Sequence, residues 1–148
     1  MLRIIIVNGP NLNLLGKRNT EIYGHDDFES FFQTLKKAYS DVQLEYYQSN
    51  VEGELINKLH EKGFSFDGII FNPGGYTHTS VALRDAIEAI SSPVVEVHIS
   101  NLHAREEFRH QSLTGFHARG MISGFGLAGY EMALSYFLDY MSSSTPQS

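Results

Sequence analysis

Three polar side chains, Glu96, His98 and Ser100, alternate with aliphatic residues in the otherwise apolar run Pro93–Ser100. Because successive side chains of a β-strand point to opposite faces, these three groups are expected to share one face. A carboxylate beside an imidazole favours the protonated ring and fixes its orientation, which suits general acid catalysis near neutral pH. Polar groups on a buried strand are costly, although a core histidine bonded to a backbone carbonyl, with Glu96 at the rim, is the structural alternative.

A glycine-rich segment, NPGGYTHTS at 72–80, follows another apolar run and precedes a helical pattern. Glycines allow the backbone to approach a ligand closely, and the N–H groups that begin a helix attract an anion. The segment lacks the lysine and the spacing of a phosphate-binding P-loop. It therefore predicts a carboxylate site with Asn72 and His78 as candidate side chains. The structural alternative is a tight turn in which Thr77 or Thr79 caps the following helix, and such a cap does not exclude the carboxylate site.

A longer polar segment, GKRNTEIYGH at 16–25, contains Arg18 and Tyr23. A tyrosine with an ordinary pKa near 10 costs roughly 4 kcal/mol to ionise at pH 7. A positive charge about 4 Å away returns a similar amount at an effective dielectric near 20. A folded loop could make Tyr23 a tyrosinate base beside Arg18, with Arg109 as a second cation. If the loop does not bring the two residues together, Tyr23 is simply an aromatic residue of the loop and Arg18 is a solvent-exposed charge.

The segments that must position these residues alternate between strand and helix patterns. Apolar runs predict five strands, at Leu2–Val7, Val42–Gln48, Phe66–Phe71, Pro93–Ile99 and Arg119–Ser123. Apolar residues at helical spacing predict helices at Asp26–Ser40, Glu52–Lys62, Thr79–Ile90 and Leu127–Met141. Gly63 is the expected C-terminal stop of the second helix.

This alternation predicts an α/β fold, a single domain at 1–141 with a doubly wound, five-stranded parallel sheet in the flavodoxin-like order. The polar residues 142–148 are expected to form a disordered tail. Ligands of such sheets bind beyond the carboxyl ends of the strands. That rule selects three polar loops, Asn8–His25, Asn72–His78 and His98–Arg109.

Composition excludes several other classes of protein. The chain of 148 residues has no cysteine, which rules out disulfides, thiolate zinc sites and a cysteine nucleophile. Its formal net charge of −6 argues against a nucleic-acid partner. No apolar run approaches the roughly 20 residues of a membrane span, and none of signal-peptide length precedes Asn8. We therefore expect a cytoplasmic protein without a membrane partner.

Several segments, in order and spacing, resemble the signature blocks of the type II 3-dehydroquinate dehydratases, or type II dehydroquinases. They are NGPNLNLLGKR at 8–18, IYG at 22–24, NPGGYTHTSVALRDA at 72–86, EVHISNLHAREEFR at 96–109 and GMISGFGLAGYEMAL at 120–134. The resemblance extends from Leu2 to about Met141 and implies a flavodoxin-like fold. It also implies the reversible dehydration of 3-dehydroquinate to 3-dehydroshikimate in the shikimate pathway, without a metal or organic cofactor.

The resemblance further implies an anti elimination through an enolate and a role for each matching residue. Tyr23 matches the base that removes the proton α to the ketone, and Arg18 matches the arginine that lowers its pKa. His98 matches the acid that protonates the departing hydroxyl, with Glu96 orienting it, and Asn11 matches a residue that holds the enolate oxygen through a water molecule. The matches to substrate-binding groups are Asn72 with the backbone N–H groups of Ile99 and Ser100 for the carboxylate, His78 and Arg109 for the hydroxyls, and Asp85 for the site of a neighbouring subunit.

The same resemblance implies a homododecamer, a tetramer of trimers. One departure is that the family reads Arg-Glu-Pro where this chain has Arg18-Asn19-Thr20, so the loop lacks a restraining proline. A flavin-binding module would need a phosphate-cradling loop after the first strand, which NGPNLNLL does not supply. A non-catalytic binding or assembly protein would be expected to have lost Tyr23, Arg18 or His98. Lys17 is the one lysine in the three loops, which argues against a Schiff-base route.

Overall fold

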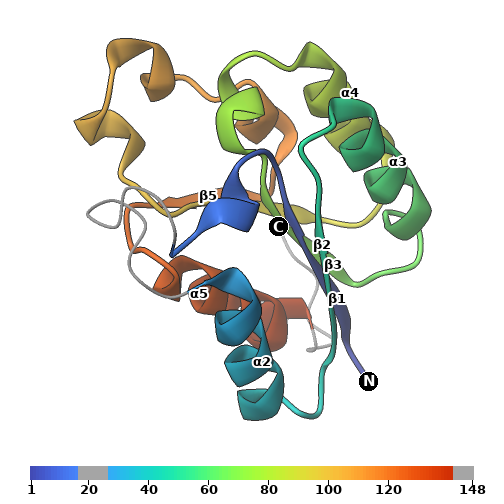
Figure 1. Cartoon of the computed structure of the whole chain (residues 1–148). Helices are drawn as coiled ribbons and strands as arrows, with labels where there is room; N and C mark the ends of the chain where they lie inside the picture. Colours follow the sequence, from blue (N-terminus) through green and yellow to red (C-terminus); the bar gives the residue numbers. More distant parts are fainter. Residues whose placement is uncertain (17–26, 142–148) are drawn as a thin grey trace.

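The computed structural model describes residues 1–16 and 27–141. Within them, five parallel strands form one sheet in the order β2-β1-β3-β4-β5 (Figure 1). The strands are β1 (Arg3–Asn8), β2 (Gln43–Gln48), β3 (Gly68–Asn72), β4 (Val94–His98) and β5 (Gly120–Ser123). This is the flavodoxin-like, doubly wound order that the sequence predicted, and each strand ends within two residues of its expected limits.

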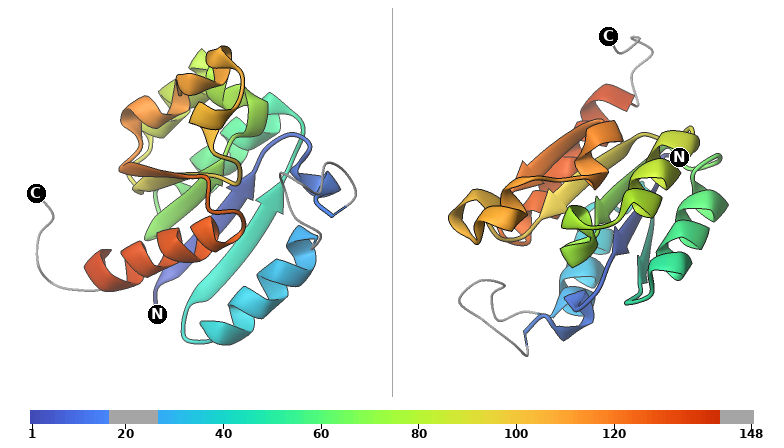
Figure 2. Two further views of the ribbon diagram at one scale, coloured as in Figure 1. Left: turned by 90° about the vertical axis from the view of Figure 1, so that its left-hand side faces the viewer. Right: turned by 90° about the horizontal axis from the view of Figure 1, so that it is seen from above.

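Helices cover both faces of the sheet (Figures 1 and 2). α2 (Phe28–Ala38) and α5 (Ala128–Tyr136) lie together on one face, while α3 (Glu52–Lys62) and α4 (Val81–Ala89) cover the other. α5 continues into a π-helical turn, η6 (Phe137–Met141). None of the helices in 1–16 and 27–141 has the length and hydropathy needed to cross a membrane.

The strand β1 is apolar along most of its length because both of its faces are buried. Ile4 and Ile6 pack in the core that includes α2 and α5, whereas Ile5 and Val7 pack in the core with α3 and α4. The apolar helix faces expected from the sequence are confirmed, by Phe28, Phe32 and Leu35 in α2, Leu55 and Leu59 in α3, and Tyr130, Leu134 and Phe137 at the C-terminal helix.

One helix end differs from the prediction, and another agrees with it for a different reason. The cap of α4 is Ser80, whose hydroxyl accepts a hydrogen bond from the backbone N–H of Leu83 at 2.9 Å, so the expectation of Thr77 or Thr79 is wrong. Ser80 is the residue in extended backbone immediately before the helix, which is the conformation that a cap requires. α3 does end at Gly63, but this glycine has a φ of −73°, in the right-handed region. A left-handed cap therefore does not explain it.

Close packing explains Gly63 instead, and it leads to a stability prediction. A Cβ added at Gly63 would lie 2.4 Å from the Leu59 carbonyl oxygen and 2.5 Å from Ile90 Cγ2. We expect Gly63→Ala to lower the free energy of unfolding by about 1–3 kcal/mol, measured by urea denaturation. Gly53, near the start of the same helix, has open space around the added Cβ, so Gly53→Ala should raise it by up to about 1 kcal/mol. Equal effects of the two changes would contradict this account.

Candidate active site

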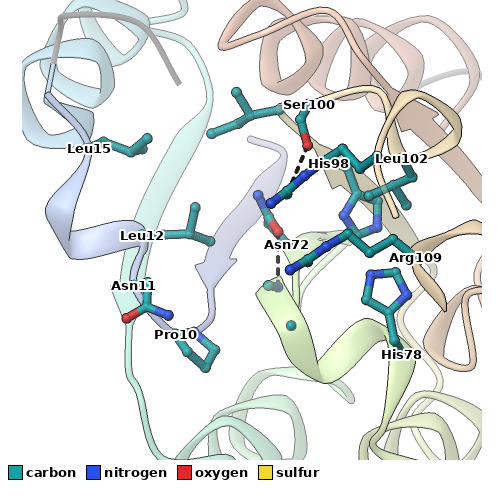
Figure 3. Close-up of a pocket in the computed structure, with 14 residues that line it drawn as sticks. Pro10, Asn11, Leu12, Leu15, Asn72, His78, His98, Ser100, Leu102 and Arg109 are labelled. Carbon is teal, nitrogen blue, oxygen red and sulfur yellow. Dashed lines mark hydrogen bonds between the residues drawn. The ribbon is translucent and has the colours of Figure 1, made fainter. Parts of the chain in front are cut away.

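A cavity of about 140 Å³ opens beyond the carboxyl ends of β1, β3 and β4 (Figure 3). It is lined by Pro10, Asn11, Leu12, Leu15, Asn72, Gly74, Gly75, His78, His98, Ile99, Ser100, Leu102, Arg105 and Arg109. All three loops selected from the sequence contribute to this lining. The edge of the sheet at which it lies is the one where open α/β sheets bind their ligands.

His98 and Glu96 form a buried hydrogen-bonded pair at the end of β4. His98 Nε2 donates to Glu96 Oε2 at 2.8 Å, and the side chain of Glu96 is completely buried. The Ser112 hydroxyl donates to the same carboxylate oxygen at 2.7 Å, and the Thr114 hydroxyl donates to the other. The expected pairing is confirmed, and the alternative of a histidine bonded to a backbone carbonyl is wrong. Because Nε2 is engaged, Nδ1 is the ring nitrogen left for a ligand in the cavity.

Asn72 ends β3, and its loop lies directly against the loop after β1. The Gly9 N–H donates to the Asn72 carbonyl oxygen at 2.7 Å. A Cβ at Gly9 would lie 2.4 Å from the Pro73 oxygen, so a glycine is needed for the two loops to approach this closely. The Asn72 side chain lines the cavity, with its Oδ1 accepting from the Gly74 N–H at 3.1 Å and its Nδ2 donating to the Tyr130 hydroxyl at 2.8 Å.

His78 and Arg109 line the side of the cavity opposite Leu12 and Leu15 (Figure 3). His78 Nδ1 lies 2.7 Å from the carbonyl oxygen of Gln111. Since a carbonyl can only accept, Nδ1 carries the proton and Nε2 is left to meet a ligand. Arg109 belongs to a short helical turn, η4 (Glu107–His110). Its side chain donates a hydrogen bond to the Glu106 carboxylate, which lowers the pKa of Glu106.

Arg105 also lines the cavity, although the sequence analysis did not single it out. Its Nη1 lies 3.4 Å from the Ser100 hydroxyl oxygen, which places a second guanidinium near the predicted carboxylate site. The charge of Arg105 and its position in the same loop as Arg109 are the signals that could have indicated it. Ser112 and Thr114 were missed as well, and no local pattern points to them because they lie 16 and 18 residues from Glu96.

The remaining residues predicted for the site are Asn11, Asp85, Tyr23 and Arg18. Asn11 lines the cavity with a φ of 71°, a left-handed conformation that asparagine tolerates, and its N–H donates to Asn50 Oδ1 at 3.0 Å. Asp85 is exposed on α4 and does not line the cavity of its own chain. Tyr23 and Arg18 lie outside the described residues.

Two of the described tyrosines have raised pKa values that make them unsuited to act as a catalytic base. Burial raises the pKa of Tyr130 far above its ordinary value, and burial raises that of Tyr46 to about 12. Both therefore keep their protons at neutral pH. Among the described residues, no three histidine, aspartate or glutamate side chains are grouped so that they could hold a metal ion.

Comparisons with known proteins agree with this arrangement. Residues 2–138 match the family model described as dehydroquinase class II. A 3-dehydroquinate dehydratase of Bacillus licheniformis is 52% identical over 141 residues, covering 94% of this chain and 97% of the relative. The 3-dehydroquinate dehydratase 1 of Agrobacterium fabrum is 56% identical over 133 residues, covering 88% and 92%. The crystal structure of type II dehydroquinase from Butyrivibrio crossotus superposes with a TM-score of 0.89 at 45% identity, covering 93% of this chain and 97% of that one.

Proposed function

Because the chain belongs to the class II dehydroquinase family and is a type II 3-dehydroquinate dehydratase, we propose that it works by anti elimination through an enolate, in the shikimate pathway. The observation that carries this proposal is the buried His98–Glu96 pair, which presents a single ring nitrogen to a cavity lined by three loops. We further propose a cytoplasmic location.

The first step in this scheme is removal of the proton on the carbon α to the ketone. The Tyr23 phenolate takes that proton, and the electron pair of the broken C–H bond moves onto the ketone oxygen as an enolate. Arg18 stabilises the phenolate as the neighbouring positive charge. Asn11 holds the enolate oxygen through a water molecule. The assignment of Tyr23 and Arg18 is supported by their match to the family's sequence, and Asn11 lines the cavity.

The second step expels the hydroxyl on the neighbouring carbon. The enolate collapses, a carbon–carbon double bond forms, and the C–O bond breaks as protonated His98 delivers its Nδ1 proton to the departing oxygen. Water and the enone are the products. Glu96, held by Ser112 and Thr114, orients the imidazole and offsets its positive charge. A base and an acid on different loops can serve opposite faces of the substrate, as anti elimination requires.

The substrate is held by groups around the same cavity. Asn72 and the backbone N–H groups of Ile99 and Ser100 bind the carboxylate, and His78 and Arg109 bind the hydroxyls. Arg105 adds positive charge near the carboxylate position. The direct test is a spectrophotometric assay for enone formation from 3-dehydroquinate. No absorbance change with the purified protein would overturn the proposed function.

We also propose that the chain assembles as a homododecamer, a tetramer of trimers, in which Asp85 reaches the site of a neighbouring subunit. The surface around Asp85 supports this. Val81, on the same helix as Asp85, is 57% exposed. Phe116 is 67% exposed, and the guanidinium of Arg84, the residue before Asp85, lies 4.1 Å from the centre of its ring. Large exposed apolar side chains on one surface are typical of a surface that a partner covers.

We expect Phe116→Glu to reduce the size of the assembly and to lower kcat/KM by about tenfold or more, because one hydrogen bond to a charged group is lost when Asp85 no longer reaches its neighbour. Sedimentation velocity gives the size, and the enone assay gives the rate. Met132→Glu is the matched control, since Met132 is 42% exposed on α5, which covers the opposite face of the sheet from α4 (Figure 1). If the Phe116→Glu protein forms an assembly of the same mass as the wild type, this surface is not the interface.

A further inference from the structure

Two buried asparagines and one buried tyrosine form a chain of hydrogen bonds beneath the cavity. Asn8 and Asn72 end β1 and β3 and lie opposite each other in the strand register. The Tyr130 hydroxyl, from α5, lies 2.9 Å from Asn8 Oδ1 and 2.8 Å from Asn72 Nδ2. Asn8 and Tyr130 are completely buried, and Asn72 is 3% exposed. This chain of hydrogen bonds therefore connects the buried core to one side chain that lines the cavity, that of Asn72.

The direction of every hydrogen bond in this chain follows from one backbone group. The Gly74 N–H can only donate, so the Asn72 side-chain atom 3.1 Å from it must be the oxygen (Figure 3). The Asn72 atom facing Tyr130 is then the amide nitrogen, which can only donate. The Tyr130 oxygen accepts that bond, and its own proton is donated to Asn8 Oδ1 at 2.9 Å. If the Asn8 amide were turned round, the buried hydroxyl proton would lose this acceptor.

The result is that the Asn72 amide is held in one orientation. Its oxygen accepts a hydrogen bond from the Gly74 N–H, and one of its two amide hydrogens is donated to Tyr130. The second amide hydrogen is left for a ligand. A wall that offers donors suits a carboxylate, which can only accept, and disfavours a neutral amide, which must also donate.

The cost of this arrangement falls on Asn8. Its Nδ2 is buried and makes no hydrogen bond of ordinary geometry within the described residues. Burial raises the pKa of Tyr46, however, and the Asn8 side chain lies close enough to the Tyr46 hydroxyl to offset part of that rise. A buried donor without a partner is destabilising, and an aliphatic residue at position 8 would avoid the penalty. An asparagine at position 8 is explained if its side-chain oxygen is needed to accept the hydrogen bond from the Tyr130 hydroxyl.

We infer that Tyr130, supported by Asn8, is a positioning residue that keeps the amide N–H of Asn72 directed to the cavity and so makes the site selective for a carboxylate over its neutral amide. The inference rests on the proposed function, in which Asn72 binds the substrate carboxylate. Tyr130 does not touch the substrate in this scheme and acts through Asn72.

The test is Tyr130→Phe, which removes the hydroxyl and keeps the ring. Without the hydroxyl, one of the two hydrogen bonds that hold the Asn72 amide is lost. Only the 3.1 Å bond from the Gly74 N–H is then left to orient it, so the amide turns more freely. Calorimetry would measure binding of the product acid and of its primary amide. We expect the affinity for the acid to fall about tenfold, the scale of one hydrogen bond to a charged group, with little loss for the amide. KM for 3-dehydroquinate should rise by a similar factor while kcat changes less than twofold.

Two further variants separate this role from loosened packing. Asn8→Leu removes the acceptor at the other end of the chain and should reduce the acid preference in the same way. In an Asn72→Ala background, Tyr130→Phe should have no additional effect on the acid. Tyr39→Phe is the control, because the Tyr39 hydroxyl bonds to Glu131 between α2 and α5, at a helix surface. Circular dichroism would establish that each variant is folded.

Three results would overturn the inference. They are equal loss of acid and amide binding in Tyr130→Phe, an unchanged preference in both single variants, and a full additional effect of Tyr130→Phe in the Asn72→Ala protein. Failure of the proposed function looks different, because the wild type would then show no enone formation. A wild type that turns over, with an acid preference that Tyr130→Phe leaves intact, overturns this inference alone.

Discussion

Tyr23→Phe is expected to abolish turnover while substrate still binds. The ring is kept, so contacts made by its faces survive, but the phenolate that removes the α-proton is lost. General base catalysis contributes about 10²–10⁴-fold to rate, and a loss of at least that size is expected in kcat. The enone assay measures turnover, and calorimetry with a substrate-like inhibitor measures binding.

We expect no other described tyrosine to replace Tyr23 as the base, for a physical reason. Tyr130 is the described tyrosine closest in the hydrogen-bond network to the cavity, but burial raises its pKa and its proton is donated to Asn8. Tyr136→Phe is the control, because the Tyr136 hydroxyl accepts a hydrogen bond from Arg119 on the surface and should be dispensable. Turnover of Tyr23→Phe within tenfold of wild type would refute the base assignment.

His98→Ala is expected to slow loss of the hydroxyl more than exchange of the α-proton. The two steps use different groups, so removing the acid leaves Tyr23 able to form the enolate, which then returns to substrate. Loss of a general acid costs roughly 10²–10⁴-fold in the step that it serves. Exchange of the α-proton with deuterium can be followed by NMR in heavy water, and product formation by the enone assay on the same sample.

Two variants help to interpret that result. His103→Ala removes an exposed histidine of the neighbouring turn η3 (Leu102–Ala104) and should leave both rates unchanged. Glu96→Gln keeps the size of the side chain but removes the charge that orients His98, so an intermediate loss in the second step is expected. Equal losses of exchange and elimination in His98→Ala would count against its role as the acid.

The parallel sheet could be predicted because burial on both faces leaves a simple pattern in the sequence. A strand such as Leu2–Val7 must be almost wholly apolar, and the helices between strands must be apolar along one face. Helix ends were less predictable. The helical backbone of α4 begins at Val81, so the cap is Ser80, one residue beyond the Thr79 position that composition suggested. Gly63 is required by Ile90, a side chain 27 residues away.

The parts of the site that could be predicted are those formed by residues close together in the sequence. Alternation along one strand places Glu96 next to His98, and the structure confirms their hydrogen bond. Glycine-rich turns after strands marked the loops that line the cavity. The sequence analysis missed Arg105, which lies in one of those loops but has no distinctive spacing.

The sequence by itself therefore determined the layered fold, the edge of the sheet that bears the site and the His98–Glu96 pair, because side-chain alternation and strand ends are properties of neighbouring residues. Only the tertiary structure brought Ser112 and Thr114 to Glu96, and Tyr130 between Asn8 and Asn72. Those contacts join residues up to 122 positions apart. Their geometry depends on how α5 and the loop before β5 pack on the sheet, and no periodicity within one segment carries that information.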